Sequence, residues 1–238
     1  KYSLRSTVAH REDGISLTHA WKILTANRQT IRFFTFLVVM TISLFMIDPV
    51  MEPYGGQIFG MPVAESTKLN AFVGIGTLIS LSTTGFLVVP RLGKRRTAKL
   101  GCFLVALCVG LIALSGVTAN PRFLQTALFL FGLANGVVTT GTICLMLDLT
   151  AVETAGTFIG AWGLGQSTAR GIAVVMGGAG LDVGKSLFTH SVFAYSLVFA
   201  LQAAGMIFAV WVLNRVEVTE FRGTGKQTIA SVIGNELD

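Results

Sequence analysis

The sequence has few charged side chains for its length. Only 13% of its 238 residues are Asp, Glu, Lys or Arg, whereas 52% are hydrophobic, and the mean hydropathy is +0.69. About 25% of the residues of a soluble domain are charged. This shortage excludes an ordinary water-soluble domain, because a folded chain of this length would need a far more polar surface. We therefore expect a lipid bilayer to be its main solvent.

The sequence also lacks the patterns of metal, disulfide and nucleotide sites. Cys102, Cys108 and Cys144 lie inside apolar runs without a CxxC motif or a nearby histidine, so we interpret them as small buried apolar side chains. The stretch AGLDVGKS (179–186) resembles a phosphate-binding loop, but alanine stands where the first glycine belongs and the stretch joins two apolar runs. No nucleophile with its base is visible, so nothing supports an enzyme.

Long apolar runs are what the sequence does have. Six of them cover residues 31–50, 69–90, 100–118, 123–148, 156–178 and 190–213. About 20 apolar residues cross the roughly 30 Å of a bilayer core as a helix, and lipid leaves the backbone no partner but itself. We predict an all-α integral membrane protein with a six-helix transmembrane domain over 31–213. An interfacial amphipathic helix is expected within 1–30, and a polar tail over 214–238.

The basic residues are distributed unevenly over the connections. With six spans, fourteen of the 18 Lys and Arg residues fall on one side, and only Lys68, Arg122 and Lys185 fall on the other. Basic residues favour the cytoplasmic side, so both termini are predicted to face the cytoplasm or stroma. The net charge of +6 then reports topology and contact with lipid headgroups, not binding to nucleic acid.

Two short motifs suggest an internal repeat. RLGK (91–94) and LDVGK (181–185) fall in the predicted second and fifth connections, on opposite membrane faces. An inverted three-plus-three repeat, as in one half of a major-facilitator-type fold, would place them so. The loop GFLVVPRLGKRR (85–96) also resembles the basic loop of such transporters, with a tight turn at Gly93 and cations that meet helix C-termini and lipid phosphates. A generic positive-inside anchor is the alternative.

A few polar residues interrupt the apolar runs. Arg170 lies within the fifth run, and Asp48 and Glu52 lie at a similar depth at the far end of the first. A buried arginine requires a carboxylate or several carbonyls, so we predict that Arg170 pairs with Asp48 or Glu52. A helix-packing ion pair without chemistry would have the same pattern.

Small residues crowd the stretches 131–141 and 156–171, which also contain Asn135 and Gln166. Such surfaces allow helix backbones to approach, or allow a flat ligand to lie against the helix. His190 begins the last run, where it is either an interfacial residue or a ligand for the magnesium of a chlorophyll.

The stretch DPVMEPYGGQIFGMPVAESTKLNAF (48–72) resembles the signature of the PucC family. The matching residues are Asp48, Glu52, Pro53, Tyr54, Gly56, Phe59 and Gly60, while Ile47 replaces the glutamine that the family usually has before the aspartate. The resemblance extends over roughly residues 20–215 and corresponds to the C-terminal half of a family that usually has about twelve spans. We expect Pro53 to end the first helix and Gly55–Gly56 to reverse the chain.

The resemblance implies a major-facilitator-like protein of a photosynthetic membrane, thylakoid or intracytoplasmic. It implies a non-enzymatic, chlorophyll-handling assembly factor or subunit of a photosystem or light-harvesting complex; a secondary transporter of a small solute is the alternative. The candidate pigment contacts are Asp48, Glu52, Tyr54, Asn135, Gln166 and His190. The expected ligands are chlorophyll, whose magnesium accepts oxygen ligands, and then carotenoid and lipid. The expected partners are photosystem or antenna subunits, membrane lipids, and a separate N-terminal six-helix half or second copy.

Overall fold

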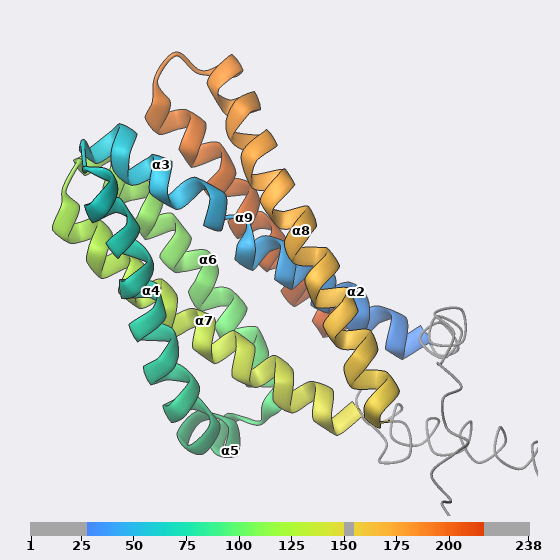
Figure 1. The fold of residues 1–238 in the computed structure, drawn as a ribbon. Helices are drawn as coiled ribbons and strands as arrows, with labels where there is room; N and C mark the ends of the chain where they lie inside the picture. The colour runs from blue at the N-terminus through green and yellow to red at the C-terminus, as the bar shows by residue number, and fades with distance from the viewer. Residues whose placement is uncertain (1–27, 150–154, 217–238) are drawn as a thin grey trace, which may run out of the picture.

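The computed structural model describes residues 28–149 and 155–216, and every regular element in these two ranges is a helix (Figure 1). The prediction of an all-α protein is confirmed for this part of the chain. The elements are α2 (Arg28–Phe45), α3 (Asp48–Phe59), α4 (Val63–Thr83), the π-helical turn η1 (Thr84–Val88), α5 (Val89–Leu92), α6 (Lys94–Thr118), α7 (Pro121–Leu149), α8 (Ala155–Leu187) and α9 (Ser191–Asn214). Most of the predicted amphipathic helix and polar tail lies outside the described residues.

Five stretches of the described chain are long and apolar enough to cross a bilayer. They are Thr30–Phe59, Val63–Leu92, Lys94–Thr118, Pro121–Asp148 and Ser191–Asn214, and they correspond to five of the six predicted runs. The other predicted run lies in α8, which has the length but is not among them. Nine of its 33 residues are glycine, and Gln166 and Arg170 lower its hydropathy further. The chain is thus a membrane protein in which α8 is the least lipid-like of the long helices.

The helices form a bundle with α6 and α7 packed together near its centre. In addition, α6 packs against α9, and α4 packs on α7. On the other side α2 packs against α8 and α9, and the short α3 contacts α4, α8 and α9 (Figure 1). α9 has the most helix neighbours, because it packs against α2, α3, α6 and α8.

Glycines of α7 let its neighbours approach to backbone distance. A Cβ added at Gly141 would lie 2.6 Å from the backbone nitrogen of Ala98 in α6, and one added at Gly132 would collide with the carbonyl oxygen of Val73 in α4. Only glycine fits at such contacts. The packing role predicted for the small residues of 131–141 is therefore confirmed.

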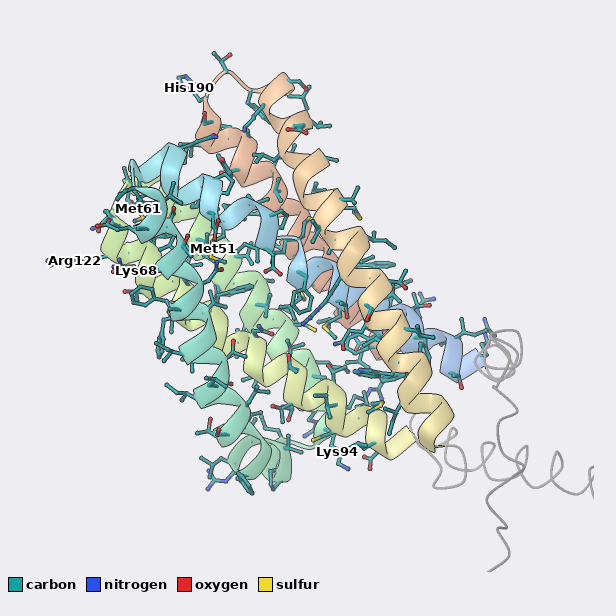
Figure 2. All side chains as sticks on the ribbon, in the orientation of Figure 1. Met51, Met61, Lys68, Lys94, Arg122 and His190 are labelled. Carbon is teal, nitrogen blue, oxygen red and sulfur yellow. The ribbon has the colours of Figure 1, made fainter. Side chains whose placement is uncertain are left out.

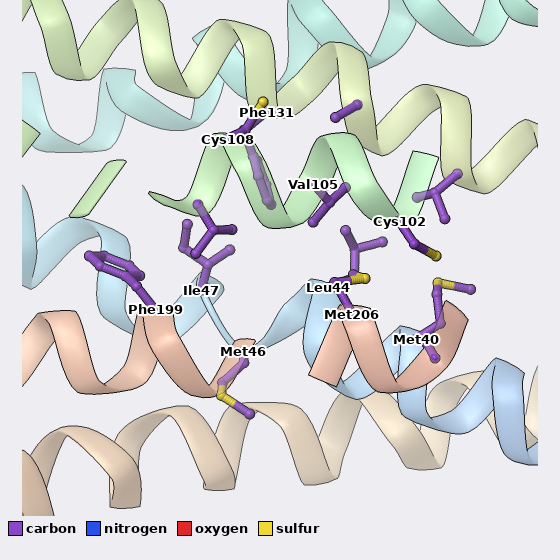
Figure 3. Packing of buried hydrophobic residues seen from close by; sticks show 14 of the residues in the cluster. Met40, Leu44, Met46, Ile47, Cys102, Val105, Cys108, Phe131, Phe199 and Met206 are labelled. Atoms are coloured by element: carbon purple, nitrogen blue, oxygen red, sulfur yellow. The ribbon is translucent and has the colours of Figure 1, made fainter. Parts of the chain in front are cut away.

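The core between these helices contains several sulfur-bearing side chains. Figure 3 shows Met40, Met206 and Cys102 among the apolar residues that fill the space between α2, α6 and α9. Cys102 and Cys108 are buried and Cys144 is half-buried, and all three are free thiols. The interpretation of the cysteines as apolar packing residues is confirmed for the first two.

The predicted helix end at Pro53 and chain reversal at Gly55–Gly56 are wrong. Pro53, Gly55 and Gly56 are inside α3, and the chain turns instead at Gly60, which has φ +65° and ends the helix. The amide of Met61 donates to the carbonyl of Gly55 (3.2 Å), which closes this helix end without help from Pro53.

The motif LDVGK (181–185) belongs to the last turns of α8, and only 188–190 connect α8 to α9. Gly184 packs there against Ala194 of α9, which extends the helix past the predicted loop. The tight turn at Gly93 (φ +79°) is as predicted. The two motifs are thus not equivalent connections.

Candidate ligand-binding face at the broken first span

The first span is broken where α2 ends at Phe45 and α3 begins at Asp48. Pro49 has no N–H, so the carbonyl of Phe45 loses its usual helical donor. The amide Nε2 of Gln202, a fully buried residue of α9, donates to the carbonyl of Leu44 (3.4 Å). Neighbouring helices thus compensate for the broken backbone, as a membrane requires.

A second helix covers the break from another side. Gly177 of α8 lies against Met46 and Pro49, so closely that an added Cβ would be 2.9 Å from Pro49 Cγ. This contact fixes α8 beside the start of α3. It also brings the middle of α8, where Arg170 lies, to the end of α2.

Arg170 of α8 lies at this break, but it stacks on an aromatic ring and does not form the predicted ion pair. The guanidinium carbon of Arg170 lies 3.8 Å from the centre of the Phe45 ring, a cation–π contact. No ion pair of 4 Å or less joins Arg170 to Asp48 or Glu52 in the described structure. Both Arg170 and Asp48 are exposed, so neither is forced into contact by burial.

Glu52 and Tyr54 point to different environments from the same short helix. Glu52 is exposed and accepts a hydrogen bond from Nδ2 of Asn70 on α4 (3.3 Å). Tyr54 is 1% exposed, donates to the carbonyl of Ile112 (2.8 Å) and packs against Phe199. Tyr54 therefore holds α3 to α6 and α9, and the fold leaves it no surface for the predicted contact with a pigment.

The two predicted amide contacts also differ. Asn135 of α7 is half-buried, with Nδ2 3.5 Å from Thr77 Oγ1 and Oδ1 accepting from Thr139 (3.1 Å), so it links α7 to α4. Gln166 is half-buried on α8 and has no side-chain hydrogen bond within the described ranges. Of the two amides, only Gln166 is free for a ligand.

Gln166 belongs to one flank of α8, which we call the α8 flank and define as Gly163, Gln166 and Arg170. These residues are three and four positions apart, so they lie on one face of the helix. A Cβ added at Gly163 would meet no atom within 4 Å. The α8 flank therefore combines an open, flat surface with an amide and a guanidinium.

His190 lies in the turn between α8 and α9, remote from the α8 flank. Figure 2 labels it with Lys68 and Arg122 toward one end of the bundle, and Lys94 at the opposite end. Its imidazole is exposed, makes no hydrogen bond with the described residues, and lies 6.2 Å from the ring of Phe193. The six predicted contacts thus do not form one site.

The Lys94 end of the bundle is held by cations. Lys94 forms an ion pair with Asp148 (2.5 Å), and a guanidinium nitrogen of Arg95 donates to the carbonyls of Leu213 (3.0 Å) and Asn214 (2.9 Å). The predicted contact between the basic loop and helix C-termini is therefore confirmed at the end of α9.

Two residues at the break were not predicted from the sequence. Gln202 is a single amide in an otherwise apolar run, so its cost in lipid could have indicated it. Phe45 carries no such indication, because its role depends on how α8 is rotated against α2. In residues 28–149 and 155–216, no group of three or more His, Cys, Asp and Glu side chains could hold a metal ion.

Comparison with known proteins shows to which family the chain belongs. The family model described as PUCC protein matches residues 2–221. The chain belongs to the PUCC family. This confirms the resemblance predicted from residues 48–72 and extends it toward both ends of the sequence.

Curated relatives of this chain come from Rhodobacter and Cereibacter species. "Uncharacterized protein in puhA-bchM intergenic region" of Rhodobacter capsulatus is 31% identical over 173 residues, covering 71% of this chain and 35% of that protein. "Protein PucC" of Cereibacter sphaeroides is 28% identical over 199 residues (81% and 43%). "Bacteriochlorophyll synthase 44.5 kDa chain" of Rhodobacter capsulatus is 28% identical over 204 residues (82% and 46%). The chain thus spans less than half the length of these PUCC relatives, and no solved structure matches it significantly.

Proposed function

We propose that this PUCC-family chain is a non-enzymatic factor or subunit that handles chlorophyll-type pigment while photosystem or antenna complexes are assembled in a photosynthetic membrane. The observation that carries the proposal is the α8 flank, an open surface with polar groups on a helix of a membrane protein. Such groups are costly against lipid and mark functional surfaces. The names of two relatives, "Protein PucC" and "Bacteriochlorophyll synthase 44.5 kDa chain", give the pigment context.

Residues at two places fit a chlorophyll. His190 has a free imidazole beside Phe193, and Glu52 has an exposed carboxylate. A bound chlorophyll would supply a magnesium ion that accepts one nitrogen or oxygen ligand from such a side chain. Carotenoid and lipid tails fit the exposed apolar surfaces of α4 and α8, which include Leu78 and Val175.

The helix contacts support a more specific fold, a three-plus-three half of a major-facilitator-type protein. In it α7 packs against α4 and α6, and α2 packs in the same way against α8 and α9. An inverted repeat would pair these contacts. A second six-helix half, on another chain or in a second copy, would then cover the face between α4 and α8. The excess of basic residues on the Lys94 side supports cytoplasmic or stromal termini.

A secondary transporter of a small solute is the second candidate. One observation favours it: Arg170 stacks on Phe45 at the end of α2 and Asp48 begins α3, so opposite charges lie at a helix break, and broken helices form substrate sites in such transporters. Its substrate would reach the same break.

The test is an absorption spectrum of the chain purified in mild detergent and titrated with a chlorophyll. We expect a shifted pigment band with the native chain and with Thr189→Ala, and a weakened one with Gln166→Ala, which removes the free amide of the α8 flank. A chain that binds no pigment but moves a solute into liposomes would contradict pigment handling and support the transporter.

A further inference from the structure

The guanidinium of Arg170 has unused hydrogen-bonding capacity. An arginine carries five N–H donors, and within the described chain this one makes a cation–π contact and no hydrogen bond. The Phe45 ring covers one face of the guanidinium, so its edges remain free to donate. A carboxylate fits such an edge with two parallel hydrogen bonds.

The position of Arg170 along α8 excludes a lipid phosphate as the natural partner. At 1.5 Å per residue, it lies about 22 Å from the start of α8 and about 25 Å from its end. A bilayer core is roughly 30 Å thick, so headgroups lie at the ends of such a helix and not beside its middle. The anion must therefore belong to a molecule that enters along the α8 flank.

The surface beside Arg170 suits a flat molecule. Gly163 lies two turns before Arg170 on the same flank, and Gly160 and Gly171 on neighbouring faces are equally open, with no atom within 4 Å of an added Cβ. Gln166, between Gly163 and Arg170, offers a free amide for a ring substituent. A planar ring can thus lie along the helix with its acidic edge at Arg170.

We infer that the α8 flank binds the free carboxylate of a chlorophyll-type tetrapyrrole, and so distinguishes the acid from the esterified pigment. This inference rests on the proposed function and names its ligand class. The esterified form has lost the negative charge that Arg170 would recognise. Asp48 begins α3 at the same break and carries the same negative charge as the ligand carboxylate, so we expect it to weaken binding of the acid.

The test measures binding of chlorophyllide and of its methyl ester to the chain in nanodiscs of neutral phosphatidylcholine. Quenching of the chain's tryptophan fluorescence reports binding, and Trp162, one of its three tryptophans, lies two turns before Arg170 on α8. We expect the acid to bind about tenfold or more tightly than the ester, since hydrogen bonds to a charged group contribute about 1.5–3 kcal/mol. Arg170→Gln should abolish this preference, Arg170→Lys should keep part of it, and Asp48→Asn should strengthen binding of the acid.

Arg122→Gln is the matched control, because Arg122 is an exposed arginine far from the α8 flank and should leave the preference unchanged. Equal binding of acid and ester would overturn the inference while leaving pigment handling intact. A preference that survives Arg170→Gln would also overturn it, as would competition by palmitate as strong as by chlorophyllide. Binding of neither tetrapyrrole would overturn both this inference and the proposed function.

Discussion

The two glycine-rich helices, α7 and α8, use the same residue type in opposite ways. In α7 the glycines at 132 and 141 lie against the backbones of α4 and α6. In α8 the glycines at 160, 163 and 171 face open space, whereas those at 177 and 184 lie against the break of the first span and against α9. A small-residue stretch in a membrane helix thus indicates a flat surface, and the neighbouring elements decide whether another helix or a ligand covers it.

The largest effect is expected at a packed glycine of α7. Gly132→Leu would force a side chain into the backbone of α4 at Val73, so we expect the free energy of unfolding to fall by about 3 kcal/mol. Gly163→Leu, which enters open space, should change it by less than about 0.5 kcal/mol. Thermal unfolding of both variants in the same detergent measures the contrast, and equal losses would contradict it.

The amides of Asn135 on α7 and Gln166 on α8 should differ in the same way, with a smaller effect on stability. Asn135→Ala removes one hydrogen bond to Thr77 of α4 and one from Thr139 of α7. We expect the free energy of unfolding to fall by about 1–2 kcal/mol. Gln166→Ala on α8 should leave stability unchanged and weaken binding of chlorophyllide. Stability and binding are measured on the same preparation, and a destabilised Gln166→Ala would show that this amide is a packing group.

Within α3 the comparison concerns a buried and an exposed side chain. Tyr54→Phe removes the donor to the Ile112 carbonyl but keeps the ring packing. We therefore expect the free energy of unfolding to fall by only about 1 kcal/mol. Glu52→Gln keeps the acceptor for Asn70 and should cost less. Denaturation in a graded series of a harsh detergent would rank the two, and the reverse ranking would place the function of Tyr54 outside the core.

The smallest expected effect, that of replacing a glycine by alanine, has opposite signs in α7 and α8. Gly163→Ala should raise the free energy of unfolding by about 0.5 kcal/mol, since alanine favours a helix and finds space there. Gly141→Ala should lower it, because its Cβ would lie 2.6 Å from Ala98 nitrogen. Unfolding temperatures of the two alanine variants test the sign, and a destabilised Gly163→Ala would mean that α8 is covered there.

The sequence predicts the helical spans well because an apolar run of sufficient length has one stable form in lipid. It does not predict the path of the first span. Pro53 was expected to end a helix, yet the chain continues to Gly60, where a left-handed residue closes the helix end. The break falls before Pro49 instead, where Gln202 and Gly177 from distant parts of the sequence support it. Long-range packing of this kind leaves no local pattern.

The candidate site was predicted in part. The predicted ion pair of Arg170 with Asp48 or Glu52 is absent from the described structure, where Arg170 instead stacks on the ring of Phe45. The stacking of Arg170 on Phe45 was not expected, since it depends on the rotation of α8 about its own axis. Rotation likewise decides that Tyr54 lies in the core and that Gln166 lies on the α8 flank, which a single sequence does not record.

The most direct test of the account asks whether the α8 flank faces a ligand path or hydrocarbon. It measures labelling of Gly163→Cys in proteoliposomes by a thiol reagent that does not cross membranes, with the unsubstituted chain as background. Leu107→Cys, at an exposed apolar position of α6, is the lipid-facing control. The account predicts that Gly163→Cys is labelled at least about tenfold faster than Leu107→Cys and that chlorophyllide protects it; equal, slow labelling of both would contradict it.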